Sequence, residues 1–264
     1  MRLEPGLRAV IQKLDEIFKK SNTRYILIGA LVPRILIDLR ESDDKGWGIR
    51  KTVDVDFAIQ VKSWNAYHQI VSRLIASGFE KRNGAPEHRL LYNDISVDII
   101  PYSKELLQED AIVWPKTGHK MVMQGFDLLF EKAKPEKITE SLSIPVIPLS
   151  LAVYTKVIAF MDRTASKDLV DIIYMLAHYE EGTVSDRRTD PDIPEEFAFE
   201  NRGAYLLGKD LKHYGLIEAL APFFQFLNES SMPLISNACR LIRVSETDFN
   251  DLMMAFRKGL YTNS

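Results

Sequence analysis

The stretch Thr52-Val-Asp-Val-Asp-Phe-Ala-Ile-Gln-Val61 decides the fold. It alternates in the manner of a β-strand, in which successive side chains point to opposite faces of the sheet. The alternation places Asp54 and Asp56 on one face, and Val55 and Phe57 on the other. We therefore predict a strand that packs one face against a core and carries two carboxylates on the other face.

A third aspartate, Asp98, lies in a second segment with strand character. Arg89-Leu-Leu-Tyr92 and Ile95-Ser-Val-Asp-Ile-Ile-Pro101 flank the pair Asn93-Asp94. Such a pair between two apolar runs is typical of a β-hairpin turn. We therefore predict two strands joined by this turn, with the second strand ending at its proline.

Three carboxylates on neighbouring strands give the oxygen-only ligand set that Mg²⁺, or Mn²⁺, accepts. Phosphoryl-type transfer needs such a site, because a metal ion held there offsets the charge that grows on the leaving pyrophosphate. An isolated Asp-x-Asp pair is more often a solvated part of a strand, and this alternative stays open. Burying three aspartates in apolar strands without partners would cost several kcal/mol each, which favours the metal.

Helices and one further strand surround these carboxylates along the chain. Apolar residues at helical spacing predict helices over 7–20, 31–39 and 65–77, and the apolar run 25–29 predicts a buried strand. Pro33 fits its helix only in the first turn. Strands and helices in this order predict an α+β fold.

The second half of the chain is predicted to be helical. Ile144-Pro-Val-Ile-Pro-Leu-Ser150 forms a hinge punctuated by prolines, and the helical pattern begins there. We therefore predict two domains, residues 1–150 and residues 151–264. Within the second, Ser166 is expected to cap a helix after a break, and residues 180–200 are expected to form an irregular loop.

Three short motifs resemble the nucleotidyltransferase superfamily of DNA polymerase β type. They are Ile28-Gly29-Ala30, Arg50-Lys-Thr-Val-Asp-Val-Asp56 and Val97-Asp98-Ile-Ile100. The resemblance implies a mixed β-sheet flanked by helices, followed by a mainly α-helical domain. Arg and Thr ahead of the aspartate pair, and a later Lys…Arg…Lys-Asp-x-x-Asp segment, resemble the AbiEii-like bacterial toxin branch, over residues 25–179.

The resemblance also implies roles for individual residues. Asp54, Asp56 and Asp98 would be the catalytic, metal-binding residues, with the last as general base toward the acceptor hydroxyl. The nucleoside triphosphate, ATP included, would be bound by a further set. That set is Gly29, Ala30, Thr52, Lys156, Arg163 and Asp171. Gly29 would begin a helix whose N-terminus binds the β- and γ-phosphates, and a tight turn is the alternative for this glycine.

Lys156 is enclosed by apolar neighbours in the sequence, so it needs an anion, and a nucleotide phosphate meets that need. The alternative is a surface lysine whose stem lies along apolar residues. Asp168 is explained by the helix dipole at the start of its helix. Asp171 is expected to pair with Lys156 or Arg163 and to hold the cation toward phosphate.

Two features depart from the family pattern. The family usually has serine or a second glycine where this chain has Ala30, which offers the phosphate no hydroxyl. The stretch from Gly29 to Asp54 is also longer than usual. Both features keep open a second hypothesis, a catalytically inactive nucleotidyltransferase-fold module that binds a nucleotide or a protein.

Composition limits the partners and the cellular location that we expect for the protein. A net charge of −3 in 264 residues gives no global basic surface for nucleic acid. No apolar run is long enough to span a membrane, and the single cysteine, Cys239, fits a reducing compartment, so we expect a cytoplasmic protein. The five histidines lack metal-ligand spacing.

The leading hypothesis is a metal-dependent enzyme that transfers a nucleoside monophosphate from a nucleoside triphosphate to a hydroxyl of RNA, protein or a small molecule. A toxin role would add an antitoxin as partner. A third interpretation takes Asp54-x-Asp56 as the motif of a nucleotide-sugar glycosyltransferase. The third aspartate on a strand and the short chain disfavour it.

Overall fold

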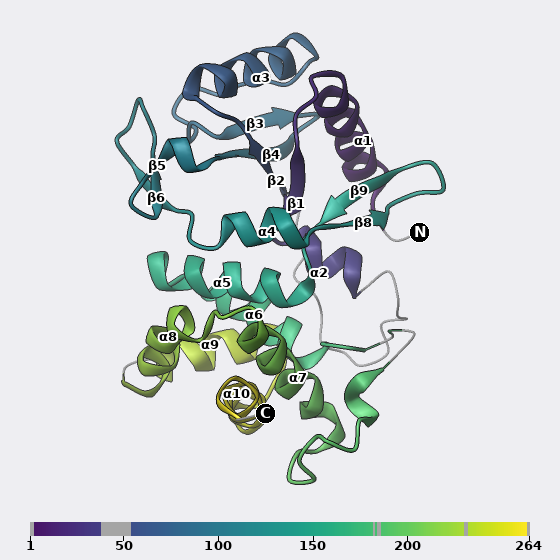
Figure 1. Cartoon of the computed structure of the whole chain (residues 1–264), viewed down its shortest axis with the longest axis vertical. Coiled ribbons are helices and arrows are strands. Elements are labelled where there is room, and N and C mark those ends of the chain that lie inside the picture. The colour runs from purple at the N-terminus through teal and green to yellow at the C-terminus, as the bar shows by residue number, and fades with distance from the viewer. Residues whose placement is uncertain (1–2, 38–53, 182, 184–185, 230–231, 263–264) are drawn as a thin grey trace. The chain divides into compact units, whose positions relative to one another are not determined.

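The computed structural model describes residues 3–37, 54–181, 183, 186–229 and 232–262 (Figure 1). Within these ranges the chain divides into two compact units, residues 3–35 with 54–148, and residues 36–37 with 149–262. The chain leaves the first unit at Pro148 and enters the second at Leu149.

A mixed sheet of six strands forms the centre of the first unit, in the order β3-β4-β2-β1-β9-β8. Its strands are β1 (Tyr25–Ile28), β2 (Asp54–Gln60), β3 (Arg89–Tyr92), β4 (Ile95–Tyr102), β8 (Lys134–Lys137) and β9 (Ser143–Val146). β2 runs parallel to β4 and antiparallel to β1, and β1 runs parallel to β9. The aspartate strand therefore lies inside the sheet, with a partner on each side.

The predicted hairpin is present between β3 and β4. Asn93 and Asp94 both have positive φ, 49° and 62°, as a two-residue hairpin turn requires. The prediction that the second strand ends at Pro101 is wrong by one residue, because β4 continues to Tyr102. Proline is tolerated there because β3 pairs with β4 only as far as Asp98, so one edge of the strand has no ladder bond to lose.

Helices cover the two faces of this sheet. On one face lie α1 (Pro5–Lys20) and α3 (Trp64–Ala76), and on the other lies α4 (Phe126–Lys132) (Figure 1). Phe18 of α1 packs edge-on against Phe57 of β2, with 5.7 Å between ring centroids. Phe130 of α4 stacks on Tyr102 of β4 at 5.6 Å. The faces are therefore distinct, and α4 covers the end of the second face that Tyr102 occupies.

The remaining elements of the first unit are short. They are α2 (Leu31–Leu36), the 3-10 turn Lys104–Leu106, and a small antiparallel sheet of β5 (Leu107–Gln108), β6 (Ala111–Val113) and β7 (Lys120–Val122). Pro33 lies in the first turn of α2, as predicted. The sequence pattern did not indicate α4.

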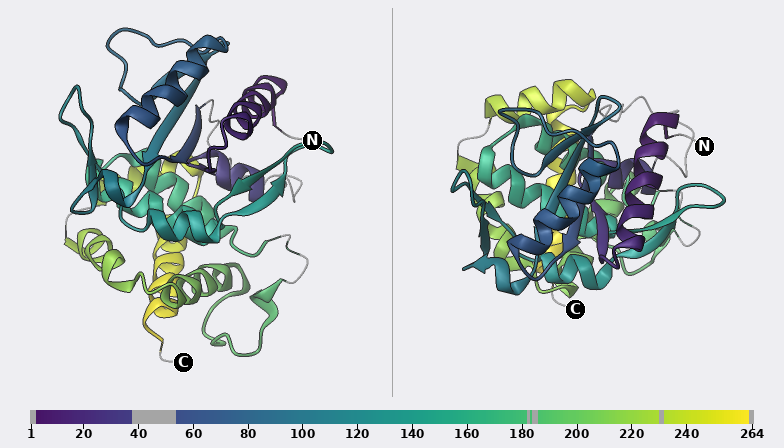
Figure 2. Two further views of the ribbon diagram at one scale, coloured as in Figure 1. Left: turned by 45° about the horizontal axis from the view of Figure 1, so that its top comes forward. Right: turned by 90° about the horizontal axis from the view of Figure 1, so that it is seen from above.

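Helices make up the second unit. They are α5 (Leu149–Arg163), α6 (Ser166–Ala177), α7 (Phe199–His213), α8 (Ile217–Glu229), α9 (Met232–Ile242) and α10 (Glu246–Tyr261), with a 3-10 turn at Arg187–Thr189. α7 and α10 cross closely, as the green and yellow helices of Figure 2 show. Glycines permit this contact. A Cβ at Gly208 would lie 2.3 Å from the carbonyl oxygen of Phe256, and one at Gly259 would lie 2.0 Å from that of Tyr205.

The predicted fold class is confirmed: the chain is an α+β protein with a mixed sheet flanked by helices, followed by a set of C-terminal helices. None of the helices among the described residues has the length and apolar character that crossing a membrane requires.

Candidate active site

A row of residues across the sheet brings two predicted carboxylates side by side. Asp56 of β2 is in register with Asp98 of β4, and Asp98 is in register with Arg89 of β3. On the other side Asp56 is in register with Ile28, the last residue of β1. Residues at the same level of neighbouring strands share a face, so both carboxylates and the guanidinium project to one side.

Asp54 lies on the same face, one pleat along β2 from Asp56. Both aspartates are partly buried, whereas Val55 and Phe57 between and beside them are fully buried. The alternation predicted for this strand is therefore present, and it ends where Ala58 and Ile59 are also buried. The predicted start of the strand at Thr52 lies outside the described residues.

Gly29 directly adjoins the carboxylate of Asp56. Its φ is +79°, and a Cβ at this position would lie 1.9 Å from Asp56 Oδ2 and 2.7 Å from Asp56 Cγ. Both facts exclude a side chain here, because the left-handed conformation favours glycine and the space is taken. The turn that follows β1 is therefore shaped around the Asp56 carboxylate.

The residues after Gly29 form a tight turn into α2, with the Val32 amide donating to the Gly29 carbonyl at 3.2 Å. Ala30 occupies this turn and is partly exposed. Thr52, the other predicted nucleotide contact in this part of the chain, lies outside the described residues.

Asp98 is bound by Arg89 through two parallel hydrogen bonds. Arg89 Nε donates to Asp98 Oδ1 at 2.8 Å and Nη2 donates to Oδ2 at 2.7 Å. His88 Nε2 lies 3.6 Å from the same Oδ2. The hydrogen bond to Asp98 raises the pKa of Arg89, and the charges of Asp98, Asp54 and Asp56 raise it further. Arg89 therefore lies in the negative field of all three aspartates.

The donor set in this face consists of hard carboxylate oxygens, which suits Mg²⁺ or Mn²⁺ in kind. Across the described ranges, however, no three or more His, Cys, Asp or Glu side chains are arranged so that they could hold a metal ion. Both oxygens of the third carboxylate, Asp98, accept hydrogen bonds from Arg89 instead.

The predicted residues of the helical half form a second, separate cluster inside the second unit. Lys156 of α5 is buried, and its Nζ lies 2.6 Å from Asp171 Oδ2 and 3.4 Å from Asp168 Oδ1, both on α6. Arg163 binds Asp168 with Nε to Oδ2 and Nη2 to Oδ1, each at 2.7 Å. Lys156 is thus a buried, paired lysine and not a surface one.

Asp168 forms ion pairs that its sequence position did not predict. Its side chain is fully buried. Burial would raise the pKa of Asp168, but the hydrogen bond from Arg163 and the charges of Lys156 and Arg163 outweigh burial and lower it. The ion pairs, and not the helix dipole alone, therefore explain this aspartate. Its spacing of three residues from Asp171 was the available signal, because such residues share one helix face.

The predicted cap of this helix is shifted by one residue. The N-cap of α6 is Ala165, without a side-chain hydrogen bond, and Ser166 is the first helical residue. The Ser166 hydroxyl accepts instead from Asn237 Nδ2 of α9 at 3.3 Å. Thr164 before it has a φ of +48°, which turns the chain between the two helices.

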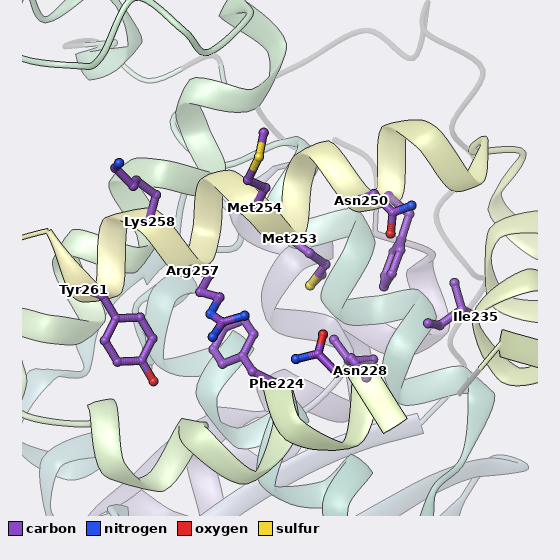
Figure 3. A pocket seen from close by; sticks show the side chains of 11 residues that line it. Phe224, Asn228, Ile235, Asn250, Met253, Met254, Arg257, Lys258 and Tyr261 are labelled. Atoms are coloured by element: carbon purple, nitrogen blue, oxygen red, sulfur yellow. The ribbon is translucent and has the colours of Figure 1, made fainter. Parts of the chain in front are cut away.

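The second unit also has a groove of about 600 Å³ between α8, α9 and α10. Met253, Arg257 and Tyr261 project into it from α10, and Phe224 and Asn228 come from α8 (Figure 3). The predicted site residues are absent from its lining. A smaller cavity of about 90 Å³ lies elsewhere in this unit, beside His178, Glu181 and Arg188.

No protein-family model and no curated protein matches the chain. Among solved structures, the chain is similar to the solution structure of the antibiotic-resistance factor ANT(2″)-Ia, with a TM-score of 0.36 and 12% identity over 63% of this chain and 80% of that one. A crystal structure of ANT(2″)-Ia in complex with adenylyl-2″-tobramycin gives a TM-score of 0.36 and 11% identity, over 63% of this chain and 86% of that one.

A crystal structure of a tRNA nucleotidyltransferase with a primer tRNA and an incoming ATP analogue gives a TM-score of 0.27 and 15% identity, over 91% of this chain and 62% of that one. These low scores and identities leave the activity of this chain to be argued from its own residues.

Proposed function

We propose that the chain is a nucleotidyltransferase that transfers a nucleoside monophosphate from a nucleoside triphosphate to a hydroxyl acceptor. The observation that carries the proposal is the register of Asp56 with Asp98 on neighbouring parallel strands, with Asp54 on the same face and Gly29 against Asp56. A fold keeps carboxylates this close only at a cost, because their like charges repel. Such a cost is typical of a site that binds cations.

In the proposed reaction the acceptor oxygen bonds to the α-phosphorus, the bond to the β-phosphate breaks, and pyrophosphate leaves. Asp54, Asp56 and Asp98 would hold Mg²⁺ or Mn²⁺, which when bound supplies charge neutralisation for the phosphates. Asp98 would accept the proton of the acceptor hydroxyl. Gly29 and Ala30 would let the backbone amides of their turn approach the phosphates, since neither residue has a long side chain.

The test is a transfer assay with labelled nucleoside triphosphates, Mg²⁺, and a mixed pool of cellular RNA, protein and small molecules as acceptors. We expect label on one acceptor class with the wild type and none with Asp54→Asn or Asp56→Asn. Asp98→Asn should keep much of the nucleotide affinity while turnover falls, because it would activate the acceptor. Equal labelling by wild type and Asp56→Asn would exclude the proposal.

The bond between Arg89 and Asp98 favours a second candidate, a nucleotidyltransferase-fold module that binds nucleotide without catalysis. In that case Asp98 serves only to hold Arg89. Calorimetric titration with a nucleoside triphosphate would then show binding, while the transfer assay would give no label on any acceptor with the wild type.

We propose further that the chain belongs with the AbiEii-like branch and acts as the toxin of a toxin–antitoxin pair in the cytoplasm. Support comes from Arg50 and Thr52 ahead of the aspartate pair, and from the later segment with Lys156, Arg163 and Asp171, which the resemblance assigns to nucleotide binding. Induced expression of the wild type should slow growth of a bacterial host. Expression of Asp56→Asn at the same level should not.

A further inference from the structure

Arg89 occupies a position in the first unit that the proposed reaction leaves without a role. It lies directly opposite Asp98 across the hairpin and binds both of its carboxylate oxygens. Bidentate pairs of arginine and carboxylate are among the stronger polar contacts in proteins. A divalent cation that approaches Asp98 therefore meets a positive charge already in place.

The guanidinium of Arg89 is also accessible. Its side chain is 39% exposed, whereas that of Asp98 is 13% exposed. The two bonds to Asp98 use Nε and Nη2, so Nη1 takes no part in them. The planar guanidinium of arginine donates two parallel hydrogen bonds to a phosphate in the same way as to a carboxylate. Arg89 can therefore exchange Asp98 for a phosphate group with little loss of hydrogen bonding.

We infer that Arg89 couples metal binding to nucleotide binding: it binds Asp98 in the nucleotide-free protein and moves to a phosphate of the triphosphate when the nucleotide binds. The inference rests on the proposed function. Metal alone binds against the charge of Arg89, and the triphosphate removes this opposition by giving Arg89 another anion. The charges of Asp54 and Asp56 also attract Arg89 toward this face of the sheet.

Coupling of this kind is reciprocal. If the nucleotide raises the affinity for metal by some factor, the metal raises the affinity for nucleotide by the same factor. Part of that factor arises in any such site, because metal and phosphates attract each other. Arg89 supplies an additional part, which its removal should abolish.

The experiment measures Mn²⁺ affinity by calorimetry, with and without a non-hydrolysable ATP analogue, in the wild type and in Arg89→Gln, Arg89→Lys and Arg82→Gln. Arg89→Gln should bind Mn²⁺ alone about 5- to 10-fold more tightly than the wild type, because the competing charge is gone, and the coupling factor should fall by a similar amount. Arg89→Lys keeps the charge without the planar fork, so its affinity for Mn²⁺ alone should stay near that of the wild type while its coupling factor falls.

Arg82 is the matched control, since it contacts Asp94 of the hairpin turn at 3.4 Å with both side chains largely exposed. Arg82→Gln should behave as the wild type. Unchanged or weaker Mn²⁺ binding by Arg89→Gln, or tightening by Arg89→Lys equal to that by Arg89→Gln, would overturn the inference and leave the proposed function standing. Failure of the proposed function looks different: wild type and Asp56→Asn would then bind Mn²⁺ equally or not at all.

Discussion

Two arginine–aspartate pairs with nearly the same geometry occupy different settings in this protein. Arg89 binds Asp98 at 2.8 and 2.7 Å in the first unit, and Arg163 binds Asp168 at 2.7 and 2.7 Å in the second. Asp168 is fully buried and also contacts Lys156, whereas Asp98 is 13% exposed and is in register with another aspartate, Asp56.

The two pairs differ in their burial and in the charges around them. Around Asp168, two cations face two carboxylates on the neighbouring helix, so the charges match within the cluster. Around Asp98, Arg89 binds one aspartate of a face that also carries Asp54 and Asp56, and His88 Nε2 lies 3.6 Å from Asp98 Oδ2. We therefore expect the same hydrogen bonds to contribute more to stability around Asp168, which is fully buried, than around Asp98.

The largest expected effect comes from removing the aspartate of each pair. Asp168→Asn should lower the free energy of unfolding by about 3–5 kcal/mol, because a fully buried carboxylate that binds both Arg163 and Lys156 is lost, and Lys156 is left with Asp171 as its anion. Asp98→Asn should lower it by about 1 kcal/mol or less, since Arg89 can reach solvent and repulsion with Asp56 is relieved. Urea unfolding of both variants checks this. Equal losses would mean that the first pair is structural too.

A second test concerns the glycine that makes room for the site. Gly29→Ala should cost about 3 kcal/mol, because its φ of +79° is strained for alanine and the new methyl collides with the Asp56 carboxylate. Gly84 is the matched control. It has a φ of +78° with nothing within 4 Å, so Gly84→Ala should cost about 1 kcal/mol. If unfolding curves show the same loss of stability for both variants, the collision with Asp56 does not contribute to the cost of Gly29→Ala.

Acid should distinguish the buried pair by a smaller effect than either substitution above. Although burial opposes it, Arg163 and Lys156 lower the pKa of Asp168 below its unfolded value near 3.9. The stability from this shift is present above that value and is lost as the pH falls through the folded pKa. The stability difference between wild type and Asp168→Asn should therefore shrink below about pH 4. A difference that stays constant down to pH 2 would contradict this.

The smallest loss of stability is expected from Arg163→Gln. This variant also tests whether the second pair takes part in nucleotide binding. The Arg163 side chain is 48% exposed, and Lys156 still neutralises Asp168 in its absence, so the loss of stability should be about 1 kcal/mol or less. Nucleotide affinity, measured by calorimetry, should be unchanged if the cluster is purely structural. A tenfold loss of affinity would instead give Arg163 the nucleotide-binding role that the family resemblance implies.

The elements around the site could largely be predicted from the sequence, because they depend on local patterns. The alternation in β2 predicted the face that Asp54 and Asp56 share, and Asn93-Asp94 predicted the hairpin. The pairing of Arg89 with Asp98 follows from that hairpin once its register is known. The position of Arg89 before the hairpin indicates that it can reach the site, but not that it bonds to Asp98, because a sequence shows which residues can face each other and not which rotamers they adopt.

The charged cluster of the helical half was harder to predict. The position of Asp168 early in its helix suggested a dipole effect, and Asp171 was expected to take the cations. Which aspartate Arg163 reaches depends on how α5 and α6 pack after the turn at Thr164, and nothing local in the sequence determines that packing. Lys156 pairs with Asp171, as expected, and also contacts Asp168. Its binding to a nucleotide phosphate stays a prediction.

The two-residue turn at Asn93 and Asp94 sets the electrostatics of a face some residues away. It fixes which residue of β3 stands opposite Asp98, and that residue is Arg89. A slip of one residue along this hairpin would turn Arg89 to the other side of the sheet and place an apolar neighbour, Leu90, beside the carboxylates. The length of this surface turn therefore determines whether a positive charge lies beside Asp98. A change in the turn would alter the net charge of the candidate site without replacing any of its aspartates.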